Sequence, residues 1–124
     1  MMAKLRKFKR FGPFGLLWPI ISILAGCPAP TSSLTLADLE SPDPAVRIQA
    51  IKWAGENKIA QAVPLLVDRL QEPDTSVRFF AIVSLKKITG TDHGFDYKAN
   101  PAQRGQAVRR WREMLAEQKQ NTQS

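Results

Sequence analysis

An internal repeat restricts the possible folds of this chain more than any other feature of the sequence. When residues 36–54 are aligned with residues 67–85, seven of the nineteen positions are identical and no gap is needed. The identical pairs are Leu39/Leu70, Pro42/Pro73, Asp43/Asp74, Val46/Val77, Arg47/Arg78, Ala50/Ala81 and Ile51/Ile82. A repeat of this length indicates supersecondary units that stack on one another and share one core.

The second unit is expected to form two helices joined by a tight turn. Its first helix has four apolar residues at the spacing of one helix face, namely Val63, Leu66, Val67 and Leu70. Glu72 and Pro73 end that helix, and Asp74 is placed to cap the next one, because its carboxylate can accept from free N–H groups of the first turn. The expected buried face of this second helix is Val77, Ala81, Leu85 and Ile88.

The first unit repeats this plan, with Asp43 as the helix cap. The apolar face of its second helix is expected to be Val46, Ala50, Trp53 and Ala54. The small side chains of Ala50 and Ala81 allow paired helices to approach closely, while Ile51 and Ile82 fill the space toward the neighbouring unit. One helix pair cannot bury its apolar stripe alone, so we expect the two pairs to share a core.

The order of a leucine-rich helix, the motif Pro-Asp-x-x-Val-Arg and a helix with Ala-Ile resembles the HEAT repeat. The resemblance is greatest to the short bacterial form that also occurs in phycobilin-lyase-type proteins, and it covers residues 34–89. It implies an all-α fold, a short α-α superhelix of two helix pairs. In that family the Asp and Arg side chains of successive repeats form a polar ladder, which implies structural roles for Asp43, Arg47, Asp74 and Arg78.

Residues 1–26 are typical of an export signal. A basic start at residues 4–10 is followed by an apolar stretch at residues 11–24, which is shorter than the roughly 20 residues that a membrane-spanning helix needs. Leu24, Ala25, Gly26 and Cys27 then resemble the lipobox of bacterial lipoproteins. The resemblance implies transfer of diacylglycerol to the Cys27 sulfur and cleavage between Gly26 and Cys27, so that residues 27–33 become the lipidated cysteine and a spacer.

Two other interpretations of the same segment are a secretory signal with an incidental cysteine and an uncleaved short anchor. Lipidation is favoured because Cys27 is the only cysteine of the chain and has no partner for a disulfide. The expected location is the cell envelope, with Cys27 acylated and the protein facing the periplasm or the exterior. Pro28 stands where some Gram-negative bacteria read an aspartate as an inner-membrane retention signal, which slightly favours the outer membrane.

The positive charge of the chain is concentrated in this export segment. Five of the 18 basic residues precede residue 11, and no acidic residue precedes Asp38, so residues 27–124 carry 13 basic and 11 acidic residues. The net charge of +7 is therefore an export feature rather than an indication of phosphate binding. We expect no nucleic-acid partner.

Residues 90–120 are expected to form a loop and a capping helix. The segment from Thr89 to Pro101 is rich in Gly, Asp and Asn, which favours an ordered loop, with Gly90 at the C-cap of the preceding helix. From Pro101 to about Lys119 a final helix follows, and it would cover the open end of the stack. Its expected apolar face is Ala107, Trp111, Met114 and Leu115.

Two groups in this C-terminal segment are candidate sites. Oxygen and nitrogen ligands lie within six residues at Asp92, His93, Asp96 and Tyr97, so a small metal-binding module using residues 92–97 is one alternative. The spacing matches no established loop, and Asx turns with Phe95 and Tyr97 packed on the core explain the same residues, so we expect no metal and no cofactor. A basic patch is formed beside Trp111 by Arg104, Arg109, Arg110 and Arg112.

Three functions compete for such a chain. A lipid-tethered repeat module can offer an extended surface to an envelope protein without any catalytic group. An enzyme is not expected, because the chain has one histidine, one cysteine and no glycine-rich phosphate loop, although a non-catalytic accessory subunit of an envelope enzyme is an alternative. Nucleic-acid binding conflicts with export. The sequence favours the scaffold module and leaves its protein partner unidentified.

Overall fold

A computed structural model describes residues 33–124 of the chain, all helical or irregular within that range. The cleavage motif Leu24–Gly26 and the lipidation residue Cys27 lie outside the described residues. The elements in chain order are the 3-10 helix η2 (Leu36–Glu40), α3 (Pro44–Glu56), the 3-10 helix η3 (Ala60–Ala62), α4 (Val63–Arg69), α5 (Thr75–Thr89) and α6 (Pro101–Gln123). None of these helices is both long enough and apolar enough to cross a membrane.

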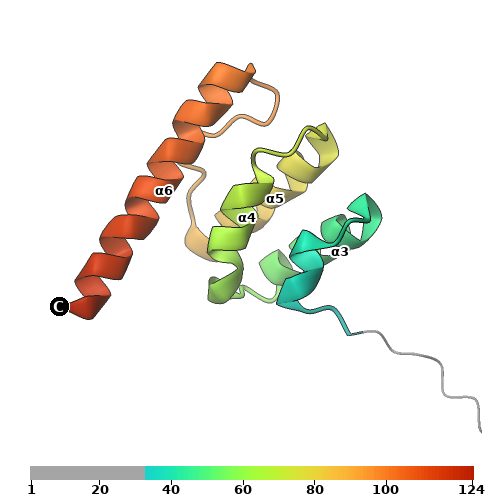
Figure 1. Ribbon diagram of the computed structural model, residues 1–124, viewed down its shortest axis with the longest axis horizontal. Coiled ribbons are helices and arrows are strands. Elements are labelled where there is room, and N and C mark those ends of the chain that lie inside the picture. The colour runs from blue at the N-terminus through green and yellow to red at the C-terminus, as the bar shows by residue number, and fades with distance from the viewer. Residues whose placement is uncertain (1–32) are drawn as a thin grey trace, which may run out of the picture. The chain divides into compact units, whose positions relative to one another are not determined.

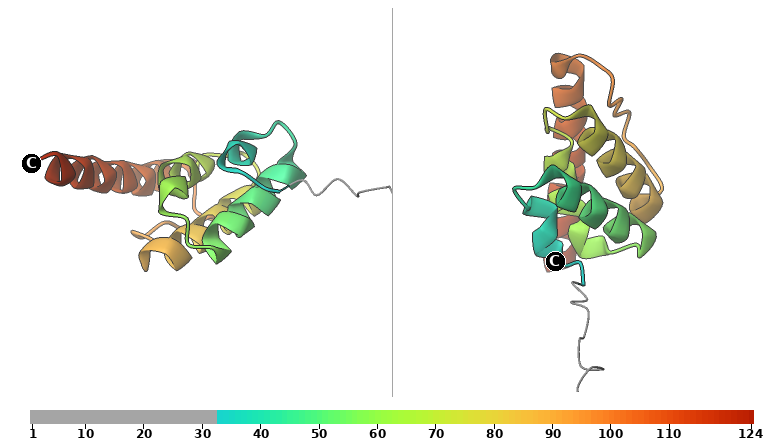
Figure 2. Two further views of the ribbon diagram at one scale, coloured as in Figure 1. Left: turned by 90° about the horizontal axis from the view of Figure 1, so that it is seen from below. Right: turned by 90° about the vertical axis from the view of Figure 1, so that its right-hand side faces the viewer.

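The helices of residues 33–124 form two layers (Figure 1). Seen from below in the left view of Figure 2, η2, α4 and α6 lie in one row, and α3 and α5 lie in the other. Extensive contacts join α3 to α5, η2 to α3 and α4 to α5, while α6 packs on α4. This is the predicted stack of two helix pairs with a final helix at its end.

The repeated motif sets the start of the two long inner helices, as predicted. Asp43 caps α3, its carboxylate accepting from the Ala45 N–H at 2.9 Å, and Asp74 caps α5 in the same way from the Ser76 N–H at 2.7 Å. Pro44 occupies the first turn of α3, where a missing N–H leaves no helical bond unmade. The two caps therefore begin equivalent helices at equivalent points of the repeat.

The first helix of the first unit differs from the plan of the second unit. Residues Leu36–Glu40 form a short 3-10 helix, whereas the equivalent segment of the second unit contains the α-helix α4. Thr35 and Asp38 close its start, since the Asp38 carboxylate accepts from the Thr35 N–H at 2.7 Å. Ser41 and Pro42 end it after five residues, and a segment this short suits the tighter 3-10 geometry.

The core is continuous through both units. Seventeen buried apolar side chains form one cluster, and Trp111 of α6 is its largest fully buried member. Most of the predicted inner-face residues are buried, namely Ala50, Ala54, Val77, Ala81, Leu85, Ala107 and Trp111. Val46, Trp53, Ile88, Met114 and Leu115 are only partly buried. Ile51 and Ile82, which were predicted to fill the space toward the neighbouring unit, belong to the same cluster.

Helices α3 and α5 approach closely at Gly55, a residue that the repeat pattern did not single out. A Cβ atom at Gly55 would lie 2.8 Å from the Ser84 Cα and 2.5 Å from its Oγ. The buried Ser84 hydroxyl donates to the Ile51 carbonyl oxygen at 2.7 Å, which links the two helices. Ala50 and Ala81 are also fully buried, so small side chains line the interface as predicted, and Gly55 is one more of them.

The end of the stack is covered by two separate segments. Helix α6 extends past the expected end at about Lys119 to Gln123, and it packs beside α4 in the outer row. Its C-terminal part projects beyond the remaining helices (Figure 2). The loop before α6 lies on α5 instead, where Phe95 is buried and Tyr97 contacts Phe79 with ring centroids 5.0 Å apart. As predicted, Gly90 ends α5 in a left-handed conformation, with φ of 85°.

The variant Gly55→Ala should lower the free energy of unfolding by about 1–3 kcal/mol, because α3 and α5 must separate to admit the methyl group. Urea unfolding followed by circular dichroism measures this change. Gly105→Ala in α6 is the matched control, since a Cβ there meets no atom within 4 Å and should leave stability unchanged or raise it by up to about 1 kcal/mol. Equal stability of the two variants would contradict the close approach.

Candidate functional site

Glu72 joins the two repeats through two arginines. Its carboxylate lies 3.3 Å from Nε of Arg47, which belongs to α3, and 2.9 Å from Nη1 of Arg69, which belongs to α4. All three side chains are largely buried: Arg47 is 13% exposed, Arg69 20% and Glu72 14%. The hydrogen bond of Arg47 to this carboxylate comes from Nη2, at 3.3 Å, and the buried Nε groups of both arginines make no hydrogen bond.

The repeated arginines share a bond that the sequence did not indicate. Arg47 donates through Nη1 to the Ser41 carbonyl oxygen at 2.6 Å, and Arg78 donates through Nη1 to the Glu72 carbonyl oxygen at 2.8 Å. Ser41 and Glu72 occupy equivalent positions of the two units, each just before the Pro-Asp pair. Each arginine therefore satisfies the carbonyl group that the turn before Pro-Asp leaves free, which gives both arginines a structural position in the repeat.

Arg78 also holds the C-terminal loop. Its Nε donates to the Tyr97 carbonyl oxygen at 3.2 Å, and its Nη2 donates to the Thr75 hydroxyl at 3.0 Å. Burial lowers the pKa of the Arg78 guanidinium below its usual value, the charge of Arg104 lowers it further, and Asp74 acts in the opposite direction. The group stays cationic at neutral pH, so its desolvation is balanced by bonds to four oxygen acceptors.

The expected polar ladder of Asp and Arg has a different acidic member. Asp43 and Asp74 direct their carboxylates to the helix starts that they cap, and the acidic partner of Arg47 is Glu72. Glu72 has no acidic counterpart in the first unit, where Ser41 occupies its position. A pairing made by an unrepeated residue leaves no trace in the repeat alignment, which is why the sequence did not identify it.

The loop of residues 91–100 is ordered by bonds to its own backbone. The carboxylates of Asp92 and Asp96 accept from the N–H groups of Gly94 and Lys98 at 2.8 and 2.9 Å, which are the predicted Asx turns. The Trp111 indole N–H donates to the Asp92 carbonyl oxygen at 3.1 Å, and its ring contacts the His93 ring edge-on at 4.4 Å. Across residues 33–124, no three or more His, Cys, Asp and Glu side chains gather in a way that could hold a metal ion.

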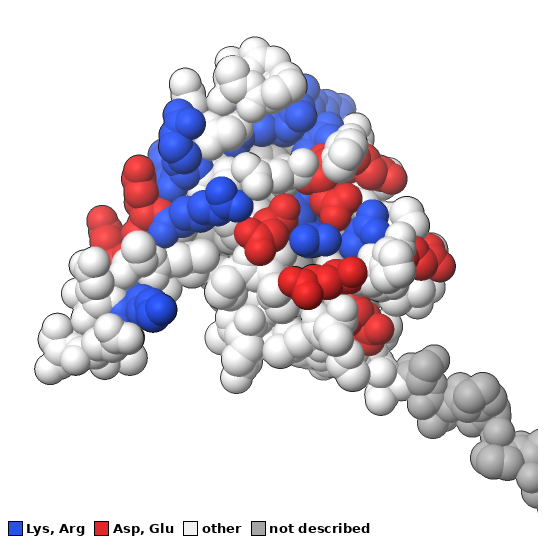
Figure 3. All heavy atoms as spheres, in the orientation of Figure 1, with Lys and Arg blue, Asp and Glu red and all other residues white. Residues whose placement is uncertain are grey.

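The arginines of the predicted basic patch differ in what they contact. Arg112 bonds to Asp68 and Gln71 of the α4 segment at 3.2 and 3.1 Å, and Arg104 bonds to the Ala99 carbonyl oxygen. Arg110 donates through Nε to the His93 carbonyl oxygen at 3.1 Å. Figure 3 shows basic side chains gathered along α6 and acidic ones over the neighbouring part of the same face. Arg112 thus joins α6 to the repeats, whereas Arg104 and Arg110 join α6 to the loop that precedes it.

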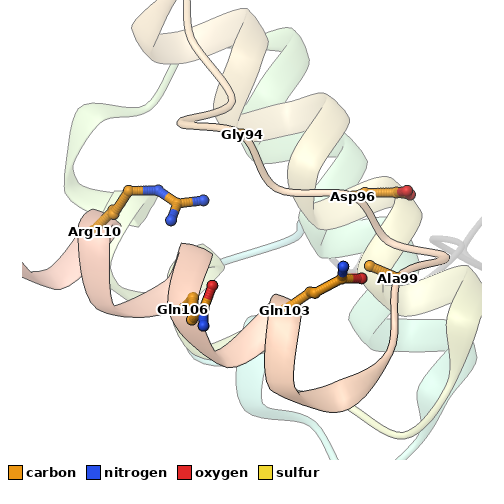
Figure 4. A pocket seen from close by; sticks show the side chains of 6 residues that line it. All are labelled: Gly94, Asp96, Ala99, Gln103, Gln106 and Arg110. Carbon is orange, nitrogen blue, oxygen red and sulfur yellow. The ribbon is translucent and has the colours of Figure 1, made fainter.

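An open hollow of about 310 Å³ lies between this loop and α6. It is lined by Gly94, Asp96, Ala99, Gln103, Gln106 and Arg110. In Figure 4 the Arg110 guanidinium reaches from α6 toward the loop, and the Asp96 side chain points away from that guanidinium. The lining offers the amide groups of Gln103 and Gln106, the Arg110 guanidinium and the Asp96 carboxylate, which can form hydrogen bonds and ionic contacts.

A model of a known family, described as HEAT repeats, matches residues 33–96. This range is just over half of the 124-residue chain and contains both units of the repeat. The chain belongs to the HEAT-repeat family. No significant match was found among curated proteins or among solved structures. The HEAT match ends within the C-terminal loop, so α6 is an addition to the repeats that the family model describes.

The variant Glu72→Gln should lower the free energy of unfolding by about 2 kcal/mol or more, because two largely buried guanidinium groups lose their carboxylate while the side-chain volume is kept. Thermal and urea unfolding measure the loss. The control is Asp68→Asn, which removes a pair with Arg112 whose side chains are both 50% exposed and should change stability by less than about 1 kcal/mol. If the two variants lost the same stability, Glu72 would not link the repeats.

Proposed function

We propose that this protein is a membrane-tethered HEAT-repeat lipoprotein that binds another protein of the bacterial cell envelope. HEAT repeats commonly mediate protein–protein interaction, and the match over residues 33–96 is the observation that carries the proposal. Repeat stacks bind partners through extended helix faces and need no catalytic residues for this purpose. A non-catalytic scaffold is also the usual character of this family.

The arrangement of the described residues supports a binding role. The polar groups with the most bonds, Glu72 and Arg78, hold repeats and loop together rather than face an enclosed cavity. The single histidine, His93, packs its ring on Trp111 and donates its backbone N–H to the Thr91 hydroxyl oxygen. The stack thus has a rigid frame, and its exposed helix faces are available for contact.

The proposed tether rests on the sequence of residues 1–27. One acyl chain gives only reversible membrane binding, whereas the two chains of a diacylglycerol group on Cys27 would make the attachment stable. Pro28 favours delivery to the outer membrane over retention at the inner one. Residues 28–33 would then separate the lipid from the HEAT repeats.

Replacement Cys27→Ser should abolish incorporation of labelled palmitate and leave the uncleaved precursor, because the serine oxygen does not receive the diacylglycerol group. Treatment with globomycin should produce a lipidated precursor of the unaltered chain. Ser33→Ala in the spacer is the control and should be labelled and processed normally. Normal processing of the Cys27→Ser chain to a soluble protein would contradict lipid attachment.

A pull-down of the full chain from detergent-solubilised envelope should recover one protein in a stoichiometric amount. The control bait is residues 1–32 fused to an unrelated soluble reporter, which keeps the lipid but lacks the repeats and should not recover that protein. Quantitative mass spectrometry compares the two. Recovery of only abundant lipoproteins, in equal amounts with both baits, would contradict the binding role.

A further inference from the structure

A row of aromatic side chains lies on the surface of α5 and of the loop that packs on it. Phe79 is 37% exposed and is the one large apolar residue of residues 33–124 that is exposed to this extent. Its ring contacts Phe80 and Tyr97 edge-on, with centroid distances of 5.2 and 5.0 Å. We call Phe79, Phe80 and Tyr97 the aromatic row. Its rings are already ordered against one another, so little conformational entropy remains to be lost on binding.

The repeat itself does not require aromatic residues at these positions. The core positions shared by the two units are identical Leu, Val, Ala and Ile residues, whereas Phe79 and Phe80 align with Ile48 and Gln49. The contact with Tyr97 covers only part of Phe79, which keeps its exposure after the loop has packed. Exposed aromatic side chains of this kind are frequent anchors of protein interfaces.

A lysine lies over each end of the aromatic row. The Lys52 ammonium is 5.5 Å from the centroid of the Phe80 ring, and the Lys98 ammonium is 5.5 Å from that of Tyr97. Neither lysine forms an ion pair with another residue of the range 33–124. The neighbouring Asp96 directs its carboxylate to the Lys98 N–H at 2.9 Å, within its own turn. Both ammonium groups therefore remain free to pair with carboxylates from outside.

We propose that the aromatic row with Lys52 and Lys98 binds an acidic segment of the partner protein, one that carries an apolar or aromatic side chain between carboxylates. The apolar side chain packs on Phe79, and the flanking carboxylates pair with the two lysines. Cation–π contact holds the lysine ammonium groups over the Phe80 and Tyr97 rings. This inference rests on the proposed binding function and assigns it to one face of the HEAT repeats.

The test places a photoreactive benzoylphenylalanine at position 79 of the full chain and irradiates the living cells that produce it. Two further chains carry the same group at Gln61 and at Gln120, which are exposed positions of η3 and of the end of α6. We expect position 79 to give one protein adduct, mapped by mass spectrometry to an acidic segment with an apolar residue. Circular dichroism of each purified chain checks that the fold is kept.

Charge reversal provides the second arm of the test. Lys52→Glu with Lys98→Glu in the photoreactive chain should lower the adduct yield at least about tenfold, because like charges then face each other. Glu56→Lys, an exposed change on the same helix α3, is the control and should not lower it. An unchanged yield after the double reversal would overturn the assignment of the acidic segment.

The three photoreactive positions separate this inference from the proposed function. A protein adduct at Gln61 or Gln120 without one at position 79 would overturn the aromatic row as the binding face and leave the scaffold role intact. Adducts of position 79 with lipid, with a second copy of this chain, or with a basic segment would also overturn it. The absence of any protein adduct at all three positions would overturn the aromatic row as the binding face; only if the pull-down also recovered no stoichiometric protein would the proposed binding function be contradicted.

Discussion

The contact between α3 and α5 is the interaction on which the remaining structure depends. These helices are equivalent elements of the two units, and they approach so closely at Gly55 and Ser84 that the Ser84 hydroxyl reaches the Ile51 carbonyl oxygen of the other helix. Because α3 and α5 form the inner row, their spacing sets where η2 and α4 can pack on the outer side. The buried Leu, Val and Ile side chains then fill a space whose width is already determined.

Polar bonds fix the turns around this inner row. Arg47 and Arg78 each satisfy the free carbonyl group at the end of the preceding segment, and Glu72 connects Arg47 of the first unit with Arg69 of the second. A buried guanidinium group without such partners would destabilise the fold. These bonds therefore favour the one turn geometry in which every arginine reaches its acceptor. The HEAT repeats are thus aligned both by apolar packing and by a chain of charged bonds.

The repeat alignment made the fold predictable, because residues that recur at the same spacing must have equivalent surroundings. The two caps, the inner helices, the buried Trp111 and the Asx turns of the loop followed from local rules of helix and turn formation. Gly55 and Glu72 could not be found in this way, since their counterparts are Lys86 and Ser41 and the alignment shows no match. The aromatic row was also missed as a surface, because Phe79 and Phe80 look like core residues until their exposure is known.

The double cover at the end of the stack limits how this protein can associate. A repeat stack with a bare end presents two unpaired rows of apolar side chains, to which another repeat or another copy of the chain can add end to end. Here α6 covers the outer row at α4 and the loop with Phe95 and Tyr97 covers the inner row at α5. Growth into a filament through this end would require both segments to detach, so assembly is directed to the lateral helix faces or to the opposite end of the stack at η2 and α3.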